Sequence, residues 1–256
     1  MFQGLKIAAV IPAYNEAACI ASVVTDLLSL GRSGCEIPSA HQPLLERVVV
    51  CDNGSSDETA AVAQEAGALV VCEAQKGYGY ACLRGQQACR DCDVIVFVDG
   101  DGSVKATDLY LLLEQLSQGA DLVIGNRLSQ LCEAGALHAH QRLGTRLYAM
   151  LISQIWQVKC EDLGPLRAIR NRVFEQLGMQ EMTWGWTAEM QAKAYASGYQ
   201  VVEVPVSTRC RIGVSKVSGT WRGTLGAALG IGQAIARVAL GQRALQSRQK
   251  PENPSI

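Results

Sequence analysis

The chain has 256 residues, of which 48% are hydrophobic and 18% are charged, and its formal net charge is −1. This composition is typical of a globular protein with a substantial core and excludes an intrinsically disordered chain. The net charge gives no overall attraction to nucleic acid, so none is expected as a partner. No Asp or Glu lies between residues 205 and 250, and this basic stretch suits an anionic partner.

Apolar runs in chain order predict β-strands, and the stretches between them predict helices. The strands are expected at 6–12, 47–51, 68–72, 94–98 and 121–125. The helices are expected at roughly 16–30, 56–66, 79–90 and 106–118. Because the strands are continuously apolar and alternate with helices, we predict an α/β fold with a mostly parallel sheet flanked by helices.

Polar, turn-forming segments follow the first four strands, at the sheet edge where ligands bind in open α/β folds. These segments are PAYNE (12–16), DNGSSDET (52–59), EAQKGYGYA (73–81) and DGDGS (99–103). Each alone is also explained by helix caps or turns, but four at one edge predict a shared binding site. The glycine loop lacks the third glycine of a dinucleotide fingerprint, and Lys76 is interpreted as a point charge for a phosphate.

Cysteine and histidine do not predict a metal centre. The ten cysteines are interpreted as reduced thiols of a cytoplasmic protein, because no signal-peptide pattern opens the chain and its core needs no disulfides. Cys89 and Cys92 form a C-x-x-C pair without the second pair that zinc needs, so we interpret them as structural. His138 and His140 have no third ligand nearby and are interpreted as part of a surface loop.

Several motifs resemble one enzyme family. IPAYNE, DNGSSDET, KGYGYA and DGDGS, in this order, are similar to the nucleotide-sugar half of family 2 glycosyltransferases with the GT-A fold. Farther along, DLVIGNR, DLGPLRAIR, WGWTAEM and EVPVSTRCRIGVSKVSGT resemble the branch that contains dolichol-phosphate mannose synthase and bacterial polyprenyl-phosphate sugar transferases. The resemblance runs from about residue 6 to about residue 220 and implies a Rossmann-like GT-A domain over residues 1–220.

The resemblance assigns a donor site. Asp99 and Asp101 match the family's D-x-D motif, whose carboxylates hold a divalent cation against the donor diphosphate, so Mg²⁺ or Mn²⁺ is the expected cofactor. Ser103 stands where the lipid-phosphate branch often has glutamine, which leaves the metal preference open. The remaining donor-binding residues implied are Pro12, Tyr14, Glu16, Asp52 and, from its charge, Lys76.

The acceptor decides which further residues matter. A phosphate acceptor already carries charge and needs positioning, for which arginine forks are suited. The resemblance implicates the following residues in binding it: Arg127, Arg142, Arg211, Ser215 and Lys216. A hydroxyl acceptor instead needs a general base, which either Asp162 or Glu189 could provide, although Glu189 lies in an expected helix that it could simply brace. We predict Asp101, Arg127 and Asp162 as the catalytic residues.

The end of the chain predicts an amphipathic helical appendage at 221–243 and a disordered tail at 244–256. The uncharged run at its centre is too short to span a membrane. Apolar residues that share one sector of about 120° on a helical projection are Leu225, Ala228, Leu229, Ile235 and Ala239. Such a helix suits peripheral membrane contact or packing on a partner subunit, which leaves homo-oligomer formation open.

We therefore predict a metal-dependent, inverting glycosyltransferase at the inner face of the membrane. It would move a hexose from a donor of the UDP-glucose or GDP-mannose type to polyprenyl phosphate. One alternative is transfer to a soluble hydroxyl acceptor with Asp162 as base. Nucleotidyl transfer is less favoured because the first strand lacks a glycine- and arginine-rich loop, and a non-catalytic sugar-nucleotide-binding protein is less favoured because Asp99 and Asp101 are intact.

Overall fold

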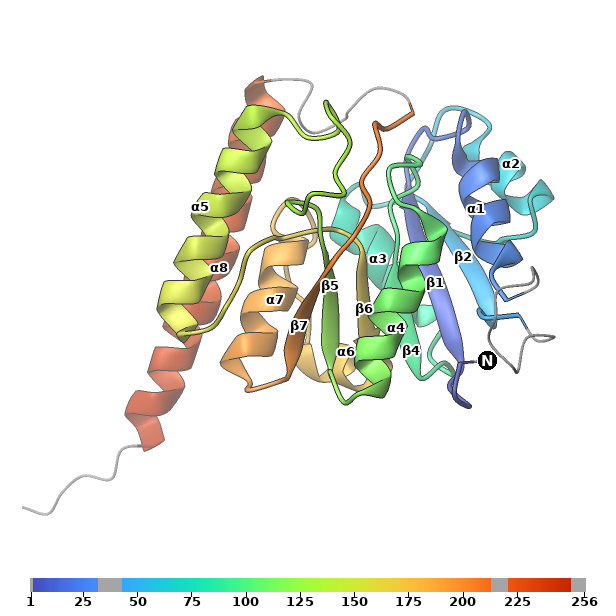
Figure 1. Ribbon diagram of the computed structural model, residues 1–256. Coiled ribbons are helices and arrows are strands. Elements are labelled where there is room, and N and C mark those ends of the chain that lie inside the picture. The colour runs from blue at the N-terminus through green and yellow to red at the C-terminus, as the bar shows by residue number, and fades with distance from the viewer. Residues whose placement is uncertain (1, 32–42, 213–220, 250–256) are drawn as a thin grey trace, which may run out of the picture.

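The computed structural model describes residues 2–31, 43–212 and 221–249 of the chain (Figure 1). Its strands are β1 (Ile7–Ala13), β2 (Arg47–Asp52), β3 (Leu69–Cys72), β4 (Val94–Phe97), β5 (Leu122–Asn126), β6 (Arg167–Arg170) and β7 (Val201–Pro205). They form a seven-stranded sheet in the order β3-β2-β1-β4-β6-β5-β7, in which only β6 runs against its neighbours. The predicted mostly parallel α/β sheet is confirmed.

Helices connect the strands and cover both faces of the sheet. They are α1 (Ile20–Ser29), α2 (Thr59–Glu65), α3 (Tyr78–Gln87), α4 (Leu109–Ser117), α5 (Ala139–Trp156), α6 (Asn171–Leu177), α7 (Trp186–Ala196) and α8 (Trp221–Gln249). A short 3₁₀ turn at Ala106–Asp108 leads into α4. The helices expected at 16–30, 56–66, 79–90 and 106–118 correspond to α1, α2, α3 and α4, each within a few residues.

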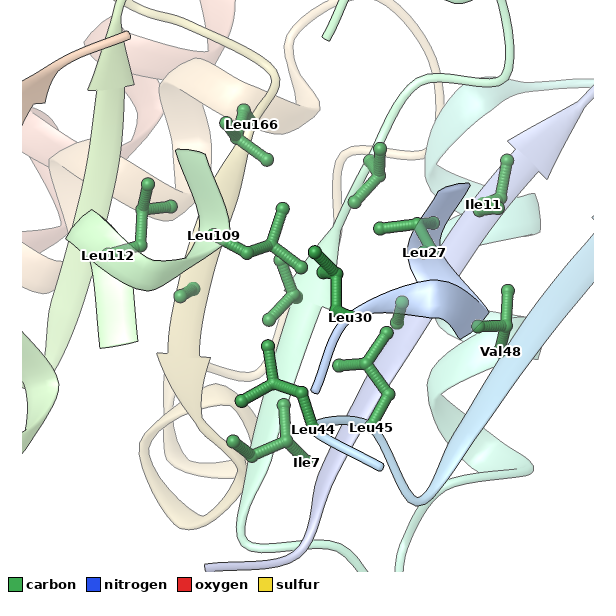
Figure 2. Close-up of a cluster of buried hydrophobic side chains, with 14 of the residues drawn as sticks. Ile7, Ile11, Leu27, Leu30, Leu44, Leu45, Val48, Leu109, Leu112 and Leu166 are labelled. Atoms are coloured by element: carbon green, nitrogen blue, oxygen red, sulfur yellow. The ribbon is translucent and has the colours of Figure 1, made fainter. Parts of the chain in front are cut away.

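Alternate residues of the strands supply two separate cores, one on each face of the sheet. On β1, Ile7 and Ile11 point into one cluster, whereas Ala8 and Val10 point into the other. Figure 2 shows the first cluster, to which leucines of α1 and α4 belong together with Ile7 and Ile11 of β1. Each fully buried leucine or isoleucine contributes about 1.5–3 kcal/mol, so the carboxyl ends of β1 and β4 are held firmly.

Strand β6 carries an arginine at each end, which hides it from a search for apolar runs. The Arg167 side chain is buried and donates to the carbonyl oxygens of Gly164 at 2.8 Å and Thr187 at 2.6 Å. Arg170 similarly donates to the carbonyls of Leu116 at 2.7 Å and Ala120 at 3.0 Å. The guanidinium groups of both arginines therefore have backbone hydrogen-bond acceptors, which allows this four-residue strand to lie inside the sheet, between β4 and β5.

Helices α5 and α8 lie side by side at the β7 end of the molecule (Figure 1). The Tyr148 hydroxyl donates to the Ala228 carbonyl at 2.8 Å, and Trp156 Nε1 donates to Gln242 Oε1 at 2.7 Å. On its other side α8 packs closely on α7, because a Cβ at Gly185 would come within 2.6 Å of the carbonyl oxygen of Gly230. Among the described residues, every helix falls short of what crossing a membrane requires.

Helix α8 is longer than the predicted appendage. It runs to Gln249, so residues 244–249 continue the helix where the sequence predicted a disordered tail, and residues 250–256 lie outside the described ranges. Ile235 of the predicted apolar sector is buried, whereas Leu229 is 58% exposed. The helix thus uses part of its apolar surface for packing within the molecule.

Cys89 and Cys92 lie in the core between α3 and β4, with exposed fractions of 0% and 3%. Burial raises the pKa of the Cys89 thiol to about 12 and also raises that of Cys92. Both side chains are free thiols, as are the other cysteines that the described ranges contain. The structural interpretation of the C-x-x-C pair is confirmed.

Candidate active site

Two aspartates lie at the end of β4, in the turn that follows the buried strand. Asp99 Oδ1 accepts a hydrogen bond from the hydroxyl of Tyr78 at 3.1 Å. Asp101 Oδ1 accepts one from the backbone N–H of Ser103 at 3.0 Å, and its Oδ2 lies 3.5 Å from Arg211 Nη1. Burial, together with the charge of Asp101, raises the pKa of Asp99 to about 7. Burial therefore disfavours the ionised form of Asp99, which a nearby positive charge would favour.

Such a pair fits a hard divalent cation, which binds carboxylate oxygen and neutralises neighbouring negative charges. Within the described part of the chain, no group of three or more His, Cys, Asp and Glu residues is arranged to hold a metal. A cation at Asp99 and Asp101 would therefore take its remaining ligands from phosphate oxygens and water, as Mg²⁺ commonly does. The rings of His138 and His140 stack on each other at 5.5 Å. Both residues are exposed, but the predicted surface loop is wrong, because His138 caps α5 and His140 lies in the first turn of that helix.

Glu16 lies against the same turn. A Cβ built on Gly100, between the two aspartates, would come within 3.7 Å of Glu16 Cγ. The thiol of Cys19 is 3.5 Å from Glu16 Oε2 and donates to the Gly100 carbonyl at 3.1 Å. The structure thus brings the PAYNE segment beside the D-x-D turn, as the shared-edge prediction requires.

The other predicted donor residues lie at the ends of β1, β2 and β3. Pro12 is half-buried within β1, and the buried Asp52 carboxylate accepts the backbone N–H of Ser55 at 3.3 Å. Lys76 Nζ donates to the Tyr14 hydroxyl at 3.2 Å and lies 4.6 Å from the centre of its ring. An exposed lysine held beside a half-buried tyrosine is well placed for an anionic ligand.

Asn53 and Tyr78 are site residues that the sequence analysis missed. Asn53 is buried, and its side-chain amide donates to the carbonyls of Glu73 at 3.1 Å and Gln75 at 2.7 Å. Its Oδ1 accepts the N–H of Gly77 at 2.8 Å. Asn53 therefore ties the loop after β3 to the end of β2, and its place beside Asp52 in DNGSSDET was the available signal.

Close packing accounts for the glycine spacing in KGYGYA. A Cβ at Gly79 would lie 2.6 Å from the Glu181 carbonyl oxygen and 2.7 Å from Met182 Cα. The Gly79 N–H donates to the Met182 carbonyl at 3.0 Å. The start of α3 consequently sits directly on the segment before α7.

Glu189 braces the same segment, because its carboxylate accepts the N–H groups of Gln180 and Glu181 and pairs with Lys193 at 3.0 Å.

Arg127, whose side chain is half-buried, pairs with the fully buried Asp162. Asp162 Oδ2 accepts from Arg127 Nε at 3.0 Å and from the Arg127 backbone N–H at 2.7 Å. Asp162 Oδ1 accepts from Arg127 Nη2 at 2.9 Å and from the Leu163 N–H at 2.7 Å. The Asp162 side chain is 0% exposed. Burial acts to raise its pKa, but Arg127 and the backbone donors outweigh burial and hold the pKa below its usual value.

A second carboxylate supports this pair. Glu203 on β7 accepts the backbone N–H groups of Glu161 at 2.9 Å and Asp162 at 3.2 Å. Asn126 Nδ2 donates to Glu203 Oε2 at 3.2 Å and to Glu161 Oε2 at 3.0 Å. The position of Asp162 is therefore fixed from β5 and β7 together, which no local sequence signal indicated.

A pocket opens beside Asp99, and three arginines line it. Its polar lining residues include Asp99, Ser103, Arg127, Thr208, Arg209 and Arg211. Arg209 was absent from the predicted set. Its backbone N–H donates to the Ser103 carbonyl at 2.9 Å, which places this segment over the D-x-D turn. Asp108 holds the segment from below by accepting the Ser207 N–H at 2.7 Å.

Of the residues predicted to bind the acceptor phosphate, one is described outside this pocket and two lie outside the described ranges. Arg142 lies in the first turn of α5 and is not among the lining residues. Ser215 and Lys216 fall outside the described ranges. Arg127 and Arg211, by contrast, are brought together with Asp99 as the shared-site prediction requires.

This sheet, with the predicted donor residues at its carboxyl edge and an arginine-lined pocket beside them, has the fold of GT-A glycosyltransferases. Glucosyl-3-phosphoglycerate synthase from Mycobacterium tuberculosis, solved with Mn²⁺, uridine diphosphate and phosphoglyceric acid, superposes with a TM-score of 0.69. The match covers 93% of this chain and 79% of that one at 19% sequence identity. A second complex of that enzyme, with Mn²⁺ and UDP-glucose, gives a TM-score of 0.70 over 93% and 80% of the two chains at 19% identity.

The chain belongs to glycosyl transferase family 2, whose model matches residues 8–178. An uncharacterized glycosyltransferase of Mycobacterium tuberculosis is 33% identical over 236 residues, which are 91% of this chain and 99% of that protein. The dolichyl-phosphate hexose transferase of Haloferax volcanii is 29% identical over 93% of this chain and 95% of its own. The polyprenol monophosphomannose synthase of Mycolicibacterium smegmatis is 29% identical over 82% and 80%. The predicted family is confirmed, and the protein is a glycosyltransferase.

Proposed function

We propose that this protein transfers a hexose from a nucleoside diphosphate sugar to the phosphate of a polyprenyl-type lipid. The observation that carries the proposal is the pocket beside Asp99, which Arg127, Arg209 and Arg211 line. A phosphate monoester is the ligand that such a set of guanidinium groups recognises best. Relatives named as dolichyl-phosphate and polyprenol-phosphate transferases support the same choice.

The donor would occupy the ends of β1 to β4. Asp52 offers carboxylate oxygens to ribose hydroxyls or a base N–H, and Lys76 above Tyr14 offers a positive charge to the diphosphate. Asp99 and Asp101 would hold the divalent cation against the diphosphate. When bound, the cation neutralises the charge that develops on the departing nucleoside diphosphate.

Transfer then needs no proton acceptor. An oxygen of the acceptor phosphate attacks the anomeric carbon as the bond from that carbon to the donor diphosphate breaks, and the electron pair leaves with the nucleoside diphosphate. The configuration at the anomeric carbon inverts. The acceptor phosphate is already largely ionised near neutral pH, so the arginines serve to hold and orient it. Asp162 keeps Arg127 in place, which makes it a positioning residue in this reaction.

Transfer to a soluble hydroxyl acceptor is the alternative. It requires a general base with an accessible oxygen. Both oxygens of Asp162 each accept two hydrogen bonds, and the side chain is buried. The geometry therefore favours the phosphate acceptor over a reaction in which Asp162 removes a proton.

A radiolabelled transfer assay tests the proposal. UDP-glucose and GDP-mannose are each offered with a polyprenyl phosphate in detergent, with the corresponding polyprenol, and with phosphoglyceric acid, in the presence of Mg²⁺ or Mn²⁺. Sugar transfer to the phosphate but not to the alcohol is expected, and Arg209→Gln should reduce it at least about tenfold through weaker acceptor binding. If sugar is transferred to phosphoglyceric acid alone, the acceptor is a soluble compound and the proposed lipid phosphate is wrong.

A further inference from the structure

We propose that the exposed apolar face of α5 docks on the surface of an anionic lipid bilayer. We call this face the α5 stripe and define it as Leu143, Leu147, Met150 and Leu151. The proposal takes its reason from the lipid acceptor proposed above, because a long polyprenyl chain stays in the bilayer while its phosphate must enter the arginine pocket. It assigns the membrane contact to α5, whereas the sequence analysis allowed either membrane contact or subunit packing for the C-terminal helix.

The α5 stripe is unusually open to solvent for side chains of this kind. Leu143 is 71% exposed, Leu147 55%, Met150 51% and Leu151 37%. At 100° per residue the four fall within about 100° of arc on one side of the helix. The opposite side holds Ala149 and Ile152, at 2% and 0%, against the molecule. A contiguous exposed stripe of large apolar residues marks an interaction surface.

Charge identifies the partner. Helix α5 carries Arg142 and Arg146 and has no Asp or Glu anywhere in its length. On the projection Arg146 flanks the stripe at about 40° from Met150. An apolar face that Arg146 flanks, on a helix without acidic residues, matches a bilayer whose headgroups are anionic and whose acyl chains begin just beneath them.

The α5 stripe also starts next to the arginine pocket. Ala136 and Leu137 line the pocket, and His138, the following residue, caps α5. Figure 1 shows this end of α5 on the side of the molecule where the strands end and the D-x-D turn lies. A bilayer that contacts Leu143 would therefore lie within two helical turns of the pocket wall, which suits a lipid whose phosphate enters it.

A second copy of the chain is the less favourable occupant. A symmetric contact through the α5 stripe would bring α5 against α5, so Arg146 would meet a helix that has no carboxylate to pair with. The neighbouring helix α8 has no acidic residue either. Like charges brought together in this way oppose association, whereas anionic headgroups remove the repulsion.

Sedimentation with vesicles tests the docking surface. The full chain is mixed with vesicles of phosphatidylcholine alone, or of phosphatidylcholine with phosphatidylglycerol. Wild type should bind the anionic vesicles, and the double variant Leu143→Gln/Leu147→Gln should bind at least about tenfold more weakly. The matched control is Leu111→Gln, a 39% exposed leucine on α4, which should bind as wild type does. Arg146→Gln should weaken binding to the anionic vesicles only. Equal melting temperatures establish that the variants fold.

Activity separates this inference from the proposed function. With a short-chain, water-soluble prenyl phosphate the double variant should keep the wild-type rate, and with polyprenyl phosphate in anionic vesicles it should lose most of it. Wild-type transfer to the short-chain acceptor without any vesicle binding would overturn the docking surface and leave the function standing. If light scattering shows a dimer for wild type and a monomer for the double variant, and neither binds vesicles, the stripe is an interface between copies of the chain. No transfer to any prenyl phosphate, with vesicle binding intact, would overturn the proposed function instead.

Discussion

The guanidinium of Arg127 holds both carboxylate oxygens of Asp162, with Nε and Nη2 at 3.0 and 2.9 Å. Arg127 also lines the pocket beside Asp99, so the pair links the interior of the protein to the candidate acceptor site. Breaking a buried pair by removing one partner leaves the other charge uncompensated. We expect Asp162→Asn to lower the free energy of unfolding by about 3 kcal/mol, measured by urea unfolding.

The same variant distinguishes a positioning residue from a general base. If Asp162 positions Arg127, Asp162→Asn should raise the KM for the acceptor and leave the pH profile of kcat unchanged. Arg127→Lys, which keeps the charge but loses the two-pronged geometry, should raise the same KM. Loss of the acidic limb of the kcat profile in Asp162→Asn, with an unchanged KM, would instead identify a general base.

Asp101 is expected to carry the metal dependence of donor binding. Asp101→Asn removes one of the two carboxylates that would hold the cation, so the affinity for UDP-glucose or GDP-mannose in Mn²⁺ should fall at least about tenfold. Calorimetry with Mn²⁺, with Mg²⁺ and with EDTA measures this effect. The control is Asp26→Asn, an exposed carboxylate on α1, which should bind donor as wild type does. Donor binding that is equally strong in EDTA would show that the donor site does not use a metal ion.

The raised pKa of Asp99 predicts how the stability of the metal-free protein depends on pH. Burial and Asp101 raise this pKa from 3.8 to about 7, so between these values the folded protein holds a proton that the unfolded chain has released. The free energy of unfolding should therefore decrease as pH rises through this window. Urea unfolding in EDTA at about pH 5 and about pH 8 should show a smaller decrease for Asp99→Asn than for wild type. An identical decrease in both proteins would contradict the assignment.

The sequence predicted those parts of the fold that depend on local pattern. The strands from β1 to β5 are uninterrupted apolar runs, and the D-x-D turn follows β4 directly, so both could be found without the structure. Strand β6 could not be predicted from the sequence. Arg167 and Arg170 fit inside the sheet only because their guanidinium groups donate hydrogen bonds to carbonyls of distant segments. The length of α8 was underestimated although residues 244–249, ALQSRQ, are mostly good helix formers, which the prediction of a disordered tail overlooked.

The residues of the candidate site also fall into those that the sequence could predict and those that it could not. Motif residues such as Glu16, Asp52 and Asp99 were identified because a resemblance attaches a role to each of them. Asn53 and Arg209 act through contacts made across the sheet edge, which become visible only when the loops are in place. A motif therefore reports which residues touch the ligand more readily than which residues hold the loops.

Asn53 provides a direct test of loop anchoring. Replacing it by alanine removes its hydrogen bonds to Glu73, Gln75 and Gly77. Because these backbone groups would lose their partners, Asn53→Ala should lower the free energy of unfolding by about 1–3 kcal/mol. It should also raise the KM for the donor, since Lys76 lies within the released loop. An unchanged donor KM in the alanine variant would show that the loop keeps its position without Asn53.

Two glycine-to-alanine changes should have opposite effects on stability. At Gly79 a new Cβ would lie 2.6 Å from the Glu181 carbonyl oxygen, which is backbone and cannot move without shifting α3 or the segment before α7. Gly79→Ala should therefore cost about 1–3 kcal/mol. Gly144 lies within α5 with nothing near its Cβ position, so Gly144→Ala should gain about 1 kcal/mol by improving helix propensity. Thermal and urea unfolding of the two variants measure both effects. A stabilised Gly79→Ala protein would mean that α3 does not pack this closely on the segment before α7.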